Sequence, residues 1–116
     1  MENIVPDDQP PPELPKNNDN VDLSWTPDGK LRVKWLDTGV TADFSVLFLR
    51  RACPCAHCRM LPHDENGLNR GLYPANLRVT EVKFVGRYGI NPIFSDGHGY
   101  GIFSYENLSK LAPLAG

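Results

Sequence analysis

The chain has 116 residues, of which 41% are hydrophobic and 22% are charged, and its formal net charge is −2. A chain of this length forms one small domain and is too short for a scaffold such as a (β/α)₈ barrel. The near-neutral charge argues against a nucleic-acid interface, which needs clustered Lys and Arg. No apolar run approaches the ~20 residues of a membrane span, and the first residues lack the order of a signal peptide. We therefore expect a cytoplasmic protein that binds neither nucleic acid nor membrane.

Residues 1–20 differ in composition from the rest of the chain. They contain five prolines, four asparagines and five acidic residues against one lysine, with few apolar residues. Such a segment buries too little apolar surface to offset the entropy of ordering it. We predict a disordered tail over residues 1–20 and one domain over residues 21–116.

Two runs of alternating apolar and polar residues, 21–25 and 31–35, flank a Pro-Asp-Gly-Lys turn and predict a β-hairpin. Its apolar side chains should share one face: Val21, Leu23, Trp25, Leu31, Val33 and Trp35.

A third strand is predicted over residues 41–44, followed by a short helix over residues 46–51 with Ser45 as its N-cap. In such a helix Val46, Leu47 and Leu49 would face the core. A continued strand is the alternative, and Pro54 ends either element.

The second half of the chain begins with a predicted irregular loop over residues 60–76, rich in Gly, Pro, Asn and Asp. A loop of this length is unusual in a compact domain unless it is functional or mobile. Residues 77–85 then alternate over nine positions and predict the longest strand.

Another strand is predicted over residues 90–95, with a tight turn over 96–99 and a hairpin partner over 100–103. Ser104 is typical of an N-cap for a helix over 105–111, which Pro113 would end. Together these elements predict an α+β fold: a small, two-layer domain with an antiparallel sheet and one or two short helices.

The three cysteines of the chain, Cys53, Cys55 and Cys58, fall within six residues. An odd number at this spacing does not indicate a disulfide framework, whereas thiolates are preferred ligands of zinc, which binds four ligands in a tetrahedron. His57, His63 and His98 are the candidates for the fourth ligand. His57 lies between two cysteines and should point away from an ion that they surround, so we favour His98, at the tip of a predicted hairpin. A closed Cys3His site is the structural type of zinc site.

Other interpretations of these cysteines remain open. Three thiolates could hold an iron–sulfur cluster with a further ligand, and small buried cysteines can also bind nothing. Nucleophilic catalysis by Cys55 or Cys58 with His57 would need an orienting group and an oxyanion site, and the sequence marks neither.

Two further patterns carry less chemistry. The glycines of residues 96–101 lie between strands, so they predict a hairpin turn and not a phosphate loop. His63 and Glu65 have the His-x-Glu spacing of 2-His-1-carboxylate iron sites, but a single match in a polar loop is most simply chance.

Several separate motifs, in collinear order between Leu31 and Leu111, give the chain a resemblance to the gamma-butyrobetaine hydroxylase-like N-terminal domain family. The segments that carry the resemblance are Val33-Lys34-Trp35, Phe48–Cys58, Val85–Ile90, Phe94–His98 and Gly101–Leu108. The resemblance implies a domain that, in the hydroxylases, precedes the iron- and 2-oxoglutarate-dependent catalytic domain. It also implies a structural zinc bound by three cysteines and a histidine, which map onto Cys53, Cys55, Cys58 and His98.

The catalytic iron ligands of the hydroxylases belong to their second domain, so the resemblance implies no oxygenase activity for this chain. Related modules occur alone in bacteria or at the end of P-loop ATPases that carry iron–sulfur clusters. Our leading hypothesis is a non-enzymatic zinc-binding accessory domain with a protein partner. The alternatives are an adaptor in iron–sulfur cluster assembly that binds a carrier protein, and an accessory subunit of an iron- and 2-oxoglutarate-dependent oxygenase.

Overall fold

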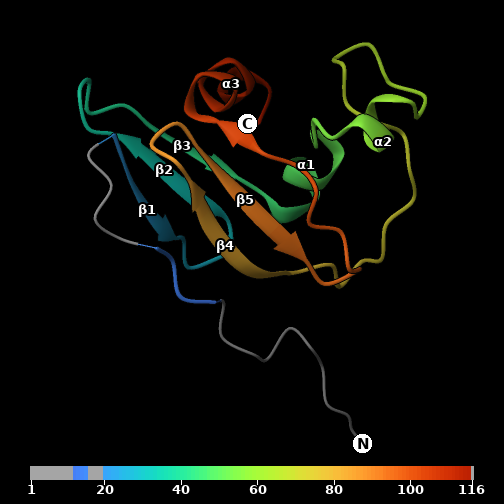
Figure 1. Ribbon diagram of the computed structural model, residues 1–116, viewed down its shortest axis with the longest axis horizontal. Helices are drawn as coiled ribbons and strands as arrows, with labels where there is room; N and C mark the ends of the chain where they lie inside the picture. The colour runs from blue at the N-terminus through green and yellow to red at the C-terminus, as the bar shows by residue number, and fades with distance from the viewer. Residues whose placement is uncertain (1–11, 16–19, 116) are drawn as a thin grey trace, which may run out of the picture.

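The structure, a computed structural model, describes residues 12–15 and 20–115 and consists of two three-stranded antiparallel sheets with short helices (Figure 1). This confirms the predicted α+β class. The elements in chain order are β1 (Val21–Trp25), β2 (Leu31–Trp35), β3 (Thr41–Phe44), α1 (Val46–Arg51), α2 (Ala56–Arg59), β4 (Val79–Val85), β5 (Gly89–Phe94), β6 (Phe103–Ser104), α3 (Tyr105–Leu111) and the 3₁₀ helix η2 (Ala112–Leu114).

The first sheet has the strand order β1-β2-β3, and the predicted hairpin is confirmed with its bounds. Leu23 lies opposite Val33, and Trp25 lies opposite Leu31, so the apolar side chains share one face as expected. Gly29, in the turn, has a φ of 86°, a conformation that costs an L side chain energy. The alternation and the turn residue together determine this register.

The second sheet has the order β4-β5-β6, and its last strand corrects a prediction. Residues 100–103 were expected to pair with β5, but β6 covers only Phe103–Ser104, which lie opposite Ile90 and Gly89. Before β6, the side-chain amide of Asn91 donates to the carbonyl oxygens of Gly99 and Gly101, at 3.0 and 2.7 Å. A side chain of β5 thus replaces ladder hydrogen bonds and allows this segment to leave the sheet.

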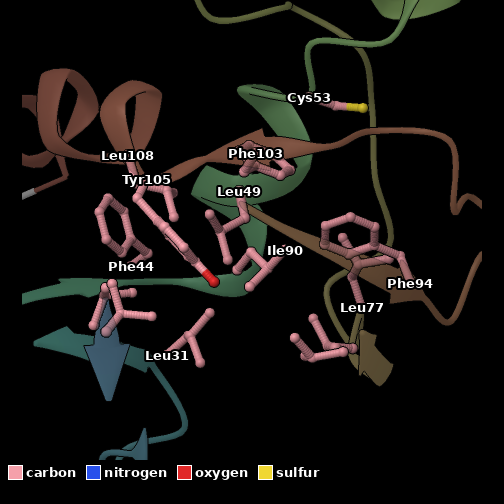
Figure 2. Close-up of a cluster of buried hydrophobic side chains, with 14 of the residues drawn as sticks. Leu31, Phe44, Leu49, Cys53, Leu77, Ile90, Phe94, Phe103, Tyr105 and Leu108 are labelled. Carbon is pink, nitrogen blue, oxygen red and sulfur yellow. The ribbon is translucent and has the colours of Figure 1, made fainter. Parts of the chain in front are cut away.

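A shared apolar core joins both sheets to α1 and α3. Figure 2 shows Leu31 and Phe44 of the first sheet, Leu49 of α1 and Ile90 of β5 gathered in one cluster beneath α3. Its buried members are Val21, Leu31, Val33, Phe44, Leu49, Cys53, Cys58, Leu77, Val79, Val82, Ile90, Phe94, Phe103, Tyr105 and Leu108. Burying each large side chain among them contributes about 1.5–3 kcal/mol relative to exposure.

The two longer helices begin at the predicted caps. The hydroxyl of Ser45 accepts from the backbone N–H of Phe48 at 3.1 Å, and that of Ser104 accepts from Asn107 at 3.0 Å. One core assignment in α1 was wrong: Leu47 is 43% exposed, whereas Phe48 packs against the core. The helix is too short for its periodicity to fix which side faces inward.

Most of the predicted tail lies outside the described residues, and the domain boundary at residue 20 stays a prediction. Of the tail, residues 12–15 and Asn20 are described: the Trp25 indole donates to the carbonyl oxygen of Pro12 at 2.8 Å, and Leu14 packs against the core. Among the described residues, no helix has the length and apolar character needed to cross a bilayer.

Candidate metal centre

The four residues chosen from the sequence, Cys53, Cys55, Cys58 and His98, come together in the structure. Their ligand atoms, three Sγ and one imidazole nitrogen, all lie within 4.8 Å of one another. The Nε2 atom of His98 lies 3.1 Å from the Sγ of Cys53, 3.5 Å from that of Cys55 and 3.6 Å from that of Cys58. Cys53, Cys58 and His98 are buried, and Cys55 is partly exposed. The sequence predicted all four members of this group.

The cysteines are positioned by the end of α1 and by α2, which the sequence analysis missed. After α1 ends at Arg51, the chain turns through Pro54, and Cys55 becomes the N-cap of the four-residue helix α2. The Sγ of Cys55 accepts from the backbone N–H of Cys58 at 3.4 Å. A helix this short depends on tertiary contacts, so its residues gave no periodic signal.

His98 is presented by the turn that follows β5. The backbone N–H of Phe94 donates to the carbonyl oxygen of His98 at 2.8 Å, and Gly97 takes a φ of 87°. The backbone N–H of His98 donates to Oδ1 of Asp96 at 3.1 Å, and the ring of Tyr100 packs edge-on against the imidazole. The turn therefore fixes the direction of the imidazole.

These positions suit one tetrahedral ion. Bonds of ~2.3 Å to sulfur and ~2.0 Å to nitrogen place sulfur and nitrogen ligands about 3.5 Å apart in a tetrahedron. The three distances from Nε2, between 3.1 and 3.6 Å, agree with this value. Soft thiolates with one imidazole are ligands that zinc accepts. The Cys3His group could therefore hold a metal ion.

The protonation of these side chains responds to burial and to neighbouring hydrogen-bond donors. Burial raises the pKa of the Cys53 thiol to about 12. Burial also acts to raise the pKa of Cys55, but hydrogen bonds from the backbone and side chain of Cys58 outweigh it, and the pKa is lowered. Burial, together with the nearby charge of Arg50, lowers the pKa of His98. A neutral imidazole is the form that binds a metal.

Arg50 and Asp96 support the site, and the sequence analysis named neither in this role. The Nη1 of Arg50 donates to the Sγ of Cys58 at 3.3 Å, and its Nε donates to Oδ2 of Asp96 at 3.0 Å. Burial alone would lower the pKa of Arg50, but its bonds to Cys58 and Asp96 raise it. Because Asp96 also accepts from the His98 backbone, one ion pair connects the cysteine segment to the histidine turn. One sequence signal could have indicated this pair: a basic residue lies just before the cysteines and an acidic residue just before His98, 46 residues apart.

Two residues make the close packing around the cysteines possible. A Cβ atom at Gly101 would overlap the Sγ of Cys53 and lie 3.2 Å from the Cδ of Pro54. Asn69 is 1% exposed, and its side-chain amide donates to the carbonyl oxygen of Arg51 at 3.0 Å. The long loop is thereby fastened to the end of α1, directly before the cysteines.

The other residues considered for chemistry are placed elsewhere. His57 and His63 are exposed, and neither belongs to a cluster of possible ligands in the described part of the chain. His63 instead forms an isolated bridge with Asn69 within the long loop, and Glu65 is exposed. The glycine-rich residues 96–101 form the turn after β5 and the segment that leads to β6, so the next regular element is a strand, as it is not in a phosphate loop.

Comparison with known proteins agrees with the sequence motifs. The family model described as gamma-butyrobetaine hydroxylase-like, N-terminal, matches residues 16–109. A crystal structure of a protein of unknown function from Acidithiobacillus ferrooxidans, described as a member of the DUF971 family, is 30% identical with a TM-score of 0.60, covering 78% of this chain and 89% of that one. An NMR solution structure shares the fold at 24% identity and a TM-score of 0.63, covering 87% and 76%.

No curated protein matches the chain. The family model nevertheless spans the first two strands, the cysteine segment and the His98 turn. The chain therefore belongs to the gamma-butyrobetaine hydroxylase-like N-terminal domain family.

Proposed function

We propose that this chain is a non-catalytic accessory domain in which a structural zinc ion, bound by Cys53, Cys55, Cys58 and His98, cross-links the cysteine segment to the turn after β5. The observation that carries the proposal is the convergence of four ligand atoms within 4.8 Å. When bound, zinc supplies a cross-link between two segments that share little regular structure. We also propose that the domain binds a protein partner.

The ligand set favours a structural role over a catalytic one. Three sulfurs and one nitrogen complete a tetrahedron, so the protein leaves no position for a water molecule or a substrate.

The ligands also favour a single ion over an iron–sulfur cluster. A cluster distributes its ligands over more than one iron atom and needs them farther apart than a single ion does. Sulfur-to-nitrogen distances of 3.1 to 3.6 Å suit one ion.

None of the three cysteines is in a disulfide, and a reducing compartment such as the cytoplasm would keep them available as metal ligands. In an oxidising compartment, disulfide formation between thiols this close would compete with metal binding. We therefore place the zinc-bound domain in the cytoplasm, where thiolates remain available as ligands.

Elemental analysis of protein produced without added metal tests the proposal. We expect about one equivalent of zinc in the natural chain and loss of that zinc, with a lower Tm, in His98→Ala. His57→Ala is the matched control, because this exposed histidine lies between two of the ligands and should leave zinc content unchanged.

Two results would overturn the proposal. The first is less than about half an equivalent of zinc, together with a His98→Ala variant whose metal content and Tm are unchanged. The second is iron with a visible charge-transfer absorption after anaerobic reconstitution, which would replace the zinc site by a cluster.

A further inference from the structure

A second feature of the molecule is a groove of about 750 Å³ that includes none of the four candidate ligands. It lies between the turn after β2, the turn between β4 and β5, and α3, which Figure 1 shows above the two sheets. The lining side chains that bear on binding are Trp35, Asp37, Val40, Tyr88 and Glu106. The groove is open to solvent, so it suits an extended surface segment better than an enclosed small molecule.

The walls of the groove are joined by hydrogen bonds between elements. The backbone N–H of Leu36 donates to the carbonyl oxygen of Asn20 at 3.0 Å, and the side chain of Asn20 donates to the carbonyl oxygen of Arg87 at 2.5 Å. The backbone N–H of Tyr105 donates to the carbonyl oxygen of Tyr88 at 2.7 Å. Both turns and the start of α3 are therefore held together, so the groove is formed before any ligand arrives.

The surface of the groove is partly apolar. Trp35 is partly buried and packs against the core, while Val40 and Tyr88 are 56% and 55% exposed. Large apolar side chains that converge on one hollow mark an interaction site more often than isolated ones do. Tyr and Trp are also the residues that most often anchor protein interfaces.

The charge of the groove is acidic. Asp37 and Glu106 line it, and none of its lining residues is basic. Glu106 has a nearby cation in Lys110, at 3.6 Å, but both side chains are largely exposed. Such a pair contributes little and exchanges readily for another cation. The carboxylates therefore remain available to a positively charged ligand and disfavour phosphate groups.

We propose that this groove binds a segment of a partner protein that carries an arginine or lysine beside an apolar side chain. The cation would lie over the faces of Trp35 and Tyr88 and pair with Asp37 or Glu106, while the apolar side chain would contact Val40. A peptide segment fits better than a small free cation, because the carboxylates and the apolar side chains together line one open groove. The proposal does not depend on the metal.

Tryptophan fluorescence of a Trp25→Phe variant tests this proposal, because its remaining indole is Trp35 in the groove. The probe is an acetylated, amidated pentapeptide with the sequence Ala-Arg-Leu-Arg-Ala, and the matched control replaces both arginines by glutamate. We expect the fluorescence of Trp35 to change saturably with the arginine peptide and not with the glutamate peptide. The affinity for the arginine peptide should fall at least about threefold as salt rises from low to physiological levels.

Variants of the groove test whether its two carboxylates bind the peptide. Asp37→Asn and Glu106→Gln should each weaken binding of the arginine peptide by about threefold or more, and the pair together by about tenfold. Glu81→Gln, an exposed position on β4 that is not part of the groove, is the control with the same charge change and should leave affinity unchanged. Circular dichroism and Tm confirm that each variant is folded.

Three outcomes of the peptide experiments would overturn the proposal. They are no saturable change with the arginine peptide, equal binding of the glutamate peptide, and an affinity that neither groove variant alters. Free arginine that binds as tightly as the peptide would also overturn it, because the groove would then be a small-molecule site.

Discussion

The first sheet and the metal-centre region achieve order by different means. In β1–β3 the strands alternate, the register is regular and the apolar face enters the core. Around Cys53–Cys58 and Asp96–Gly101 there is one helix of four residues and little ladder pairing. There the backbone is fixed by side chains: Arg50, Asp96, Asn69 and Asn91. The first sheet of this small domain thus follows local rules, whereas the metal-centre region needs specific cross-links.

Metal removal should widen this difference most. With the proposed zinc removed by a chelator, we expect amide hydrogen exchange in residues 53–59 and 96–101 to accelerate about 100-fold or more, since a ligand at 100 times its Kd stabilises by about 2.7 kcal/mol. Exchange in β1 and β2 should change far less. Equal acceleration in both regions would contradict the comparison and indicate that the metal supports the whole domain.

Replacing Arg50 breaks the connection between the two ligand segments. Arg50→Met should cost about 2–3 kcal/mol in the free energy of unfolding, because it leaves Asp96 without its partner and removes the donor to Cys58. Zinc affinity should fall by about tenfold or more. Denaturant unfolding and competition with a chelator measure both effects. Arg50→Lys keeps the charge but lacks the planar guanidinium that donates to Cys58 and Asp96 together, so it should recover only part of the loss.

Gly101→Ala tests close packing at the cysteines. The added Cβ would overlap the Sγ of Cys53, so we expect a loss of about 1–3 kcal/mol in stability together with weaker zinc binding. Gly29→Ala is the control in the first sheet, with a φ of 86° and open space around the Cβ. It should cost about 1 kcal/mol without altering zinc affinity. Equal effects of the two variants on zinc binding would count against the site.

The smallest expected effect concerns pH and the first sheet. The hydrogen bond from Arg32 lowers the pKa of Asp43, which lies opposite it across β2 and β3. The pair therefore stabilises the fold above the ordinary aspartate pKa of about 3.9, and this contribution is lost as pH falls through the lowered value. Asp43→Asn should lower Tm slightly at pH 7 and not at the acid end. Arg32→Gln should do the same, and the double variant should add little.

The sequence by itself determined the parts of this protein whose signals are local. Strand alternation set the first hairpin, two serines set the starts of α1 and α3, and cysteine chemistry together with a hairpin histidine predicted all four members of the Cys3His group. Each depends on residues within a few positions of one another, or on a chemistry that few side chains possess.

Only the tertiary structure decided the remaining features. α2 is too short to be periodic. Asn91 replaces the ladder hydrogen bonds predicted for residues 100–103, and Phe48 packs against the core where Leu47 was expected. Arg50 meets Asp96 across 46 residues, and the groove beside Trp35 draws on both sheets and α3. Contacts between distant segments depend on how whole elements pack, and that packing is not encoded in any short stretch of the chain.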